Sequence, residues 1–244
     1  MNKGVLLALC GAAFFICSAQ TPAPQALPSK PLRHLEYNFD VVYMQTGEGH
    51  VGAIGTNGSG IVSHDATNGR QGKMSVDVLA TAKDGGLVIR AQETLPNQPR
   101  QQVGVTCAVY GNGEVLCGND RTNIPSDAIA VLFSHLGRDF YDPSLINEKG
   151  HWTRYFEANN ISISSSFSMP KLEDGKPSAI FEHRDIKSID GTQPDMSEDT
   201  RLAYDTALLV PTKVFNEAVQ SSRGAGYVRT RVNLSLVSDS FANH

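Results

Sequence analysis

Apolar and polar residues alternate along most of this 244-residue chain, and the alternation restricts the folds open to it. From Leu35 to Tyr43 every second residue is apolar or aromatic, while Glu36, Asn38 and Asp40 stand between them. Side chains of a β-strand point alternately to the two faces of a sheet, so this segment is predicted to be a half-buried strand. The same pattern predicts strands at residues 74–80, 87–91, 103–109, 161–169, 179–189, 201–210, 213–219 and 227–237.

One segment in the middle of the chain has the spacing of a helix instead. Its apolar residues recur at i, i+3, i+4 and i+7; they are Ile129, Leu132, Phe133 and Leu136. Ser126 is a suitable N-cap and Gly137 a suitable end, so the segment from Ser126 to Leu136 is predicted to be an amphipathic helix of about three turns that packs on a sheet. The fold is therefore expected to be mainly β, with about five or six long antiparallel strands on each side of one helix.

The first 19 residues are typical of an export signal. After Met1 and Lys3, an uncharged stretch runs from Gly4 to Cys17, which is too short to span a bilayer, and small residues follow it at 17–19. We expect cleavage before Gln20. The mature chain is then expected to be periplasmic or secreted, and to carry no transmembrane anchor.

The remainder of the chain is expected to divide into a linker and one domain. Residues 20–34 contain four prolines and almost no large apolar side chain, which predicts a Pro-rich extended linker. Residues 35–244 are predicted to form a single β-rich domain, since one all-β domain of this length can bury a real core.

Two cysteines lie outside the predicted signal, Cys107 and Cys117. In an oxidising compartment two such cysteines favour one disulfide. Between them stands Gly111-Asn112-Gly113, whose residues tolerate the positive φ of a hairpin turn, so a short loop there places the cysteines opposite each other. A structural disulfide is favoured over a redox pair, because redox pairs normally have Cys-x-x-Cys spacing.

Composition and motifs give little support for cofactor or nucleic-acid binding. The formal net charge of −4 does not indicate a nucleic-acid partner. The glycine-rich stretch from Gly55 to Gly60 lacks the following helix with Lys-Ser or Lys-Thr that a phosphate-binding loop needs. It is predicted to be a loop at the rim of the sheet, and no cofactor is expected.

Two histidine–aspartate pairs are the candidates for catalysis or metal binding. They are His64-Asp65 and His183-x-Asp185, and the latter two side chains share one face of a predicted strand. Neither a Gly-x-Ser-x-Gly nucleophile motif nor a third metal ligand at a matching spacing accompanies them. The sequence therefore favours no catalytic residue and no metal, and an enzyme, such as a hydrolase, is the third of three hypotheses.

The order of strands, central helix, Gly150-His151-Trp152 and further long strands resembles the curved antiparallel sheets of exported bacterial proteins such as the outer-membrane lipoprotein carriers. This resemblance implies a strongly curved sheet or half-barrel, whose concave face holds an apolar ligand beneath the helix. A lipid or another apolar small molecule is the partner of this first hypothesis. Its candidate ligand-binding residues are Leu132, Phe133, Leu136 and Trp152, for each of which an ordinary core role is the alternative.

The second hypothesis is an envelope structural or interaction protein that docks a protein partner. Arg229 and Arg231 form a basic strip with Tyr227 and the nearby Arg223, and such a strip suits an acidic surface. The alternative is a solvated outer face of the last strand that discourages edge pairing.

Overall fold

The computed structural model describes residues 30–51, 60–82, 84–96, 98–118, 123–138, 151–158, 160–169, 178–191, 195–205, 207–222 and 226–241. The predicted export signal lies outside these residues, as do the linker before Lys30 and the glycine-rich stretch before Gly60. These predictions therefore remain untested.

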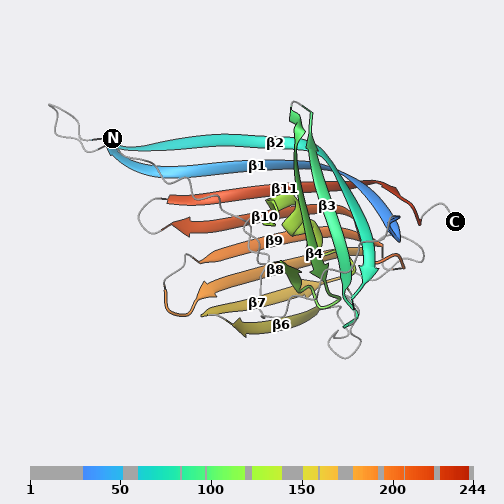
Figure 1. Ribbon diagram of the computed structural model, residues 1–244. Coiled ribbons are helices and arrows are strands. Elements are labelled where there is room, and N and C mark those ends of the chain that lie inside the picture. The colour runs from blue at the N-terminus through green and yellow to red at the C-terminus, as the bar shows by residue number, and fades with distance from the viewer. Residues whose placement is uncertain are drawn as a thin grey trace.

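Eleven strands and one helix make up the described part of the chain (Figure 1). Five strands precede the helix α1 (Asp127–Phe133): β1 (Arg33–Val51), β2 (Gly60–Thr81), β3 (Leu87–Leu95), β4 (Gln98–Val109) and β5 (Val115–Cys117). Six follow it: β6 (His151–Ala158), β7 (Ile161–Ser168), β8 (Ser178–Ser188), β9 (Met196–Asp205), β10 (Val210–Ser222) and β11 (Gly226–Asp239). The predicted order of strands, helix and strands is confirmed.

All the strands belong to one antiparallel sheet, in the order β5-β4-β3-β2-β1-β11-β10-β9-β8-β7-β6. The first and last strands pair at its centre, where Val41 lies opposite Val232. From this central pair the two halves of the sheet, β1 to β5 and β6 to β11, extend outward as simple meanders. The sheet is not closed, because β5 and β6 each have a neighbour on one side only.

The sheet curves around α1 (Figure 1). β3 and β4 cross in front of the later strands, and the helix lies between these two parts of the sheet. The helix contacts β1, β10 and β11, while its N-cap residue Ser126 donates a hydrogen bond to Glu93 of β3. The helix thus fills the hollow of a strongly curved sheet, which confirms the predicted fold class.

The core forms where the concave faces of both halves of the sheet meet the helix. Alternate residues supply it, as in Leu35, Tyr37, Phe39 and Val41 of β1, all of which are at most 3 % exposed. The last three strands contribute in the same way, with Leu202, Tyr204, Val214, Val232 and Leu234. The alternation seen in the sequence therefore identifies the buried face of these strands.

The helix differs from its prediction in length and in burial. It ends at Phe133, after which a turn at residues 134–137 carries the chain to Gly137, whose φ is +67°. All seven helical residues are buried, so α1 has no solvated face. A single apolar stripe was predicted because the sequence does not reveal that the sheet surrounds the helix on several sides.

The predicted strand 201–210 is wrong at its C-terminal end. β9 ends at Asp205, whose carboxylate accepts hydrogen bonds from the backbone N–H groups of Ala207 and Leu208. Leu209 has a φ of +53°, and Val210 already belongs to β10. The aspartate turn reverses the chain inside an apolar run that looks continuous in the sequence.

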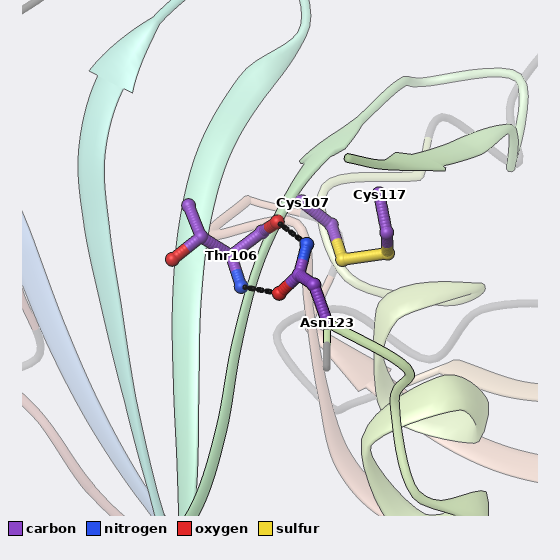
Figure 2. The surroundings of a disulfide bond; sticks show 4 residues. All are labelled: Thr106, Cys107, Cys117 and Asn123. Atoms are coloured by element: carbon purple, nitrogen blue, oxygen red, sulfur yellow. Dashed lines mark hydrogen bonds between the residues drawn. A yellow bond between two sulfur atoms is a disulfide. The ribbon is translucent and has the colours of Figure 1, made fainter. Parts of the chain in front are cut away.

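Cys107 and Cys117 form the predicted disulfide, and they are direct partners in the pairing of β4 with β5 (Figure 2). Their Cα atoms are 4.2 Å apart, and Gly113 in the turn between them has a φ of +88°. Beside the disulfide, the Asn123 side-chain amide accepts from the backbone N–H of Thr106 and donates to its carbonyl (Figure 2). Asn123 thereby satisfies the backbone hydrogen-bonding groups of Thr106 in β4, which lies just beyond the residues that pair with the short strand β5.

Replacing both cysteines with serine is expected to lower the free energy of unfolding by at most about 3 kcal/mol, because the disulfide closes a short loop. Urea denaturation of the oxidised protein and of the double variant measures this difference. A loss well above about 3 kcal/mol would contradict a purely local role for the disulfide.

Candidate functional site in the hollow of the sheet

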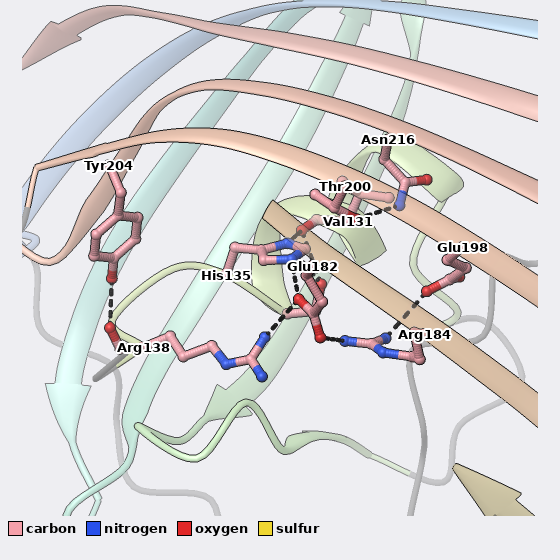
Figure 3. A network of polar contacts seen from close by, with 10 residues as sticks. Val131, His135, Arg138, Glu182, Arg184, Glu198, Thr200, Tyr204 and Asn216 are labelled. Atoms are coloured by element: carbon pink, nitrogen blue, oxygen red, sulfur yellow. Dashed lines mark hydrogen bonds and ion pairs between the residues drawn. The ribbon is translucent and has the colours of Figure 1, made fainter. Parts of the chain in front are cut away.

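Glu182 of β8 is the centre of a buried polar cluster between α1 and the concave face (Figure 3). The residue is 3 % exposed. Its Oε2 atom lies 3.1 Å from His135 Nε2 and accepts a hydrogen bond of 3.0 Å from Arg138 Nη1. Its Oε1 atom accepts a hydrogen bond of 2.9 Å from Arg184. Glu182 therefore connects the chain just after α1 with the sheet.

Five neighbouring side chains of β8, β9 and β10 form what we call the polar belt: Glu182, Arg184, Glu198, Thr200 and Asn216. Strand pairing places Glu182 opposite Thr200, Arg184 opposite Glu198, and Thr200 opposite Asn216. Arg184 Nη1 donates to Glu198 at 3.2 Å, and Asn216 Nδ2 donates to Thr200 at 2.9 Å. The belt thus crosses three strands on the concave face.

The polar belt follows from the same period-two pattern that builds the core. On β8, Ile180, Glu182, Arg184 and Ile186 share one face, and the two isoleucines are buried. The outer positions His183 and Asp185 alternate with them. Sequence reasoning considered the His183 face and missed the charged residues of the opposite, inner face. The available signal was a Glu and an Arg in phase with two isoleucines.

The segment after α1 supplies the other half of the cluster. His135 Nδ1 lies 2.7 Å from the Val131 carbonyl oxygen and 3.0 Å from Ser134 Oγ. Arg138 lies over the Phe167 ring, 5.0 Å from its centroid, and its carbonyl accepts a hydrogen bond from Tyr204. Besides Glu182 of β8, the strands β7 and β9 therefore also contact this segment.

Polar contacts also hold the N-terminal end of α1. Ser126 caps the helix by accepting from the Ile129 N–H at 3.3 Å, and its hydroxyl donates to Glu93, which also pairs with Arg70. Tyr43 of β1 donates to Asp127 in the first turn. Burial and this hydrogen bond raise the pKa of Tyr43 to about 12. Both ends of the helix are thus connected to the sheet through charged groups.

Burial and neighbouring charges set the ionisation of the cluster. Burial opposes the ionisation of Glu182, but Arg138 and Arg184 outweigh it and hold the pKa of Glu182 well below its ordinary value. Burial lowers the pKa of His135, although Glu182 partly offsets this. Burial raises the pKa of Glu198, with Arg184 acting in the opposite direction. At neutral pH Glu182 is therefore a carboxylate.

A small cavity lies between α1 and the polar belt. Its lining includes Ala130 and His135 on the helix side and Arg184, Glu198 and Asn216 on the sheet side. Its volume of about 20 Å³ accommodates roughly one water molecule. Pockets for small ligands are usually about 300 to 1,000 Å³. The helix itself occupies the hollow.

The structure brings three of the four candidate ligand-binding residues together. Leu132 and Phe133 are 0 % exposed and Leu136 is 2 % exposed, and all three belong to the core inside the hollow. The backbone of Trp152 lies in the edge strand β6, opposite Phe167 of β7. Its side chain lies outside the described part of the structure. A ligand-binding role for these residues remains a proposal.

His183 and Asp185 lie on the convex face, and Asp199 lies beside them, a contact that the sequence did not predict. His183 Nδ1 is 2.9 Å from Asp199 of β9, and its Nε2 is 3.6 Å from Asp185. The hydrogen bond to Asp199 raises the pKa of His183. Among the described residues, no three His, Cys, Asp or Glu side chains are placed to hold a metal ion. The side chains of His64 and Asp65 lie outside the description.

The arginines proposed for docking are paired within the sheet. Arg231 and Arg229 of β11 both form ion pairs with Glu217 of β10, the second at 3.7 Å. Arg229 also lies over the Tyr227 ring, 5.7 Å from its centroid. The strip therefore carries less free positive charge than its sequence suggests. Arg223 lies outside the described residues.

No protein-family model matches this chain, and no curated protein matches it. One similar solved structure is that of lipovitellin, which was solved to show lipid–protein interactions in that protein. The two share 10 % sequence identity with a TM-score of 0.49, over 86 % of this chain and 26 % of that one. The chain thus spans about a quarter of the length of that protein. No helix within the described ranges is long and apolar enough to cross a membrane.

Proposed function

We propose that the protein is an exported, non-enzymatic carrier that binds an apolar or amphipathic ligand in the hollow of its sheet. In this account α1 fills the hollow while the ligand is absent, and the ligand takes its place. The observation that carries the proposal is the complete burial of a seven-residue helix inside an otherwise open, apolar-lined concave face.

The length of α1 supports its role as a displaceable filler. A helix of seven residues does not persist alone in water, since isolated helices shorter than about 12 to 15 residues are marginal. Its order therefore depends on the surrounding sheet. The strands, by contrast, pair with one another over long registers that do not involve the helix. The helix can thus leave without breaking the pairing of the sheet.

The chemistry of the hollow indicates the kind of ligand. Ile129, Leu132 and Phe133 occupy an apolar region, and the polar belt lies beside it. A molecule that replaces the helix has to cover the apolar face and also to leave Glu182 and Arg184 solvated or paired. An amphipathic lipid satisfies both requirements.

Native mass spectrometry of the gently purified, exported chain tests this function, followed by solvent extraction of bound molecules. We expect a stoichiometric lipid adduct, either after purification or after mixing with vesicles of phosphatidylethanolamine and phosphatidylglycerol. The same mass reports cleavage before Gln20 and the loss of two hydrogens in the disulfide. A mass without adduct under both conditions would contradict the carrier and direct attention to protein partners.

A further inference from the structure

We propose that Tyr43 and Arg70 bind the carboxylate of a long-chain fatty acid, at the place that the carboxylate of Asp127 takes while α1 fills the hollow. The inference rests on the proposed function and narrows its ligand to one chemical class. In this account Asp127 is the internal substitute for the polar group of the ligand, and the apolar side chains of α1 are the substitute for its hydrocarbon chain.

Asp127 demonstrates that the sheet holds a buried carboxylate at this place. It is the first residue of α1 and is 6 % exposed. Its Oδ2 atom accepts a hydrogen bond from the hydroxyl of Tyr43 on β1. The pKa of Tyr43 is about 12, so the hydroxyl keeps its proton at neutral pH and acts as the donor. The sheet therefore contributes a hydrogen-bond donor that points at a carboxylate of the helix.

Arg70 of β2 orients this donor and places a positive charge beside it. It donates a hydrogen bond to the Tyr43 oxygen and forms an ion pair with Glu93 of β3. Its guanidinium group lies over the Phe39 ring, 5.2 Å from the centroid. All four residues belong to the sheet, so their arrangement does not depend on the presence of α1.

Departure of α1 removes the acceptor of Tyr43 but leaves the donor in place. A polar group that has lost its partner in an apolar hollow is unfavourable. The carboxylate of an incoming ligand restores the hydrogen bond, and a hydrogen bond to a charged group is stronger than one between neutral groups. Thr230 of β11, directly opposite Tyr43, lines the small cavity beside Asp127 and adds a second hydroxyl group at this place.

The surroundings of Tyr43 suit an apolar chain attached to the carboxylate. Phe39 and Val41 precede Tyr43 on the concave face of β1 and are at most 3 % exposed. Leu132 of α1 belongs to the same core and is 0 % exposed. A molecule with its carboxylate at Tyr43 therefore places its chain in the apolar region that α1 occupies.

The polar belt does not offer the same chemistry. Glu182 and Glu198 both pair with Arg184. Another carboxylate beside them would meet two groups that carry carboxyl oxygens, whereas an ammonium group would be attracted. The two polar regions of the hollow therefore favour head groups of opposite charge, and a ranking of ligands by head group distinguishes them.

Displacement of the fluorescent probe 1-N-phenylnaphthylamine at pH 7.5 tests the assignment, with oleate, oleyl alcohol and oleylamine as competitors below their micelle concentrations. The three share one hydrocarbon chain and differ in head group. We expect oleate to bind at least about tenfold more tightly than the other two. Equal affinity of oleate and oleyl alcohol, or a preference for oleylamine, would support the carrier and overturn the carboxylate site. Absence of binding by the probe and by all three would contradict the carrier itself.

Tyr43→Phe identifies the group responsible. The change also weakens the contact with α1, but that effect is the same for all three ligands, so the readout is the ratio of the oleate affinity to the oleyl alcohol affinity. This ratio should fall about tenfold in the variant. Tyr155→Phe, at a 67 % exposed position of β6, is the matched control and should keep the ratio of the wild type. An unchanged ratio in Tyr43→Phe would overturn the proposal, and if this variant does not fold, the ranking in the wild type decides alone.

Discussion

Replacing Glu182 with glutamine is expected to lower the free energy of unfolding by about 3 to 5 kcal/mol, as is usual when one member of a buried ion-pair network is removed. The variant keeps the size of the side chain but removes the charge that compensates Arg138 and Arg184. Both guanidinium groups then remain in a hollow that has little water. Urea denaturation at pH 7.5 measures the loss.

Glu217→Gln is the matched control for this experiment. Glu217 also joins two arginines, Arg229 and Arg231, but on the outer face of the sheet, where Arg231 is 41 % exposed. Exposed ion pairs contribute about 0 to 1 kcal/mol, so this variant should lose little stability. If both variants lost the same free energy of unfolding, the burial of Glu182 would not account for its contribution to stability.

The effect of Glu182→Gln also depends on pH in a defined direction. The folded state keeps the pKa of Glu182 well below 4.5, because Arg138 and Arg184 outweigh the effect of burial. The ionised Glu182 carboxylate therefore stabilises the folded state fully above pH 4.5, and this stabilisation is lost as the pH falls towards the lowered pKa. The difference between the wild type and the variant is expected to shrink below pH 4.5.

Phe133→Ala is expected to cost about 3 to 5 kcal/mol, the usual range for removing a fully buried phenylalanine side chain. Phe133 is 0 % exposed, and it lies in the helix that fills the hollow. The cavity left behind is lined by apolar groups, and such cavities bind small apolar molecules. The variant should therefore bind 1-N-phenylnaphthylamine more tightly than the wild type does, despite its lower stability.

The outcome for Phe133→Ala distinguishes two roles of this residue. Tighter probe binding indicates that Phe133 blocks the hollow, whereas weaker binding indicates that it contacts the ligand. Phe181→Ala, a change at a 43 % exposed position of β8, serves as the control and should alter neither stability nor binding appreciably. A loss of less than 1 kcal/mol for Phe133→Ala would contradict its place in the core.

The fold could be predicted where local pattern decides it. Period-two alternation identifies the buried face of β1, and Gly113 between two lone cysteines predicts the turn and the disulfide. Ser126 was likewise identifiable as the helix cap. Each of these features depends on residues that are close together in the sequence.

The candidate site depends on contacts between distant segments, and local pattern does not reveal them. His135 and Glu182 are 47 residues apart, and only the curvature of the sheet brings them together. Charged residues are usually assigned to the surface, so Glu182 and Arg184 were overlooked. Asp199 reaches His183 through a register that the sequence does not specify.

Hydrogen exchange with and without oleate at pH 7.5 tests the central claim most directly, since it asks whether ligand and helix compete for one hollow. With oleate bound, we expect faster exchange of the amides of residues 128–136 and unchanged protection of β1, β10 and β11. Bound oleate with unchanged or increased protection of α1 would contradict the claim, because the ligand would then occupy another site.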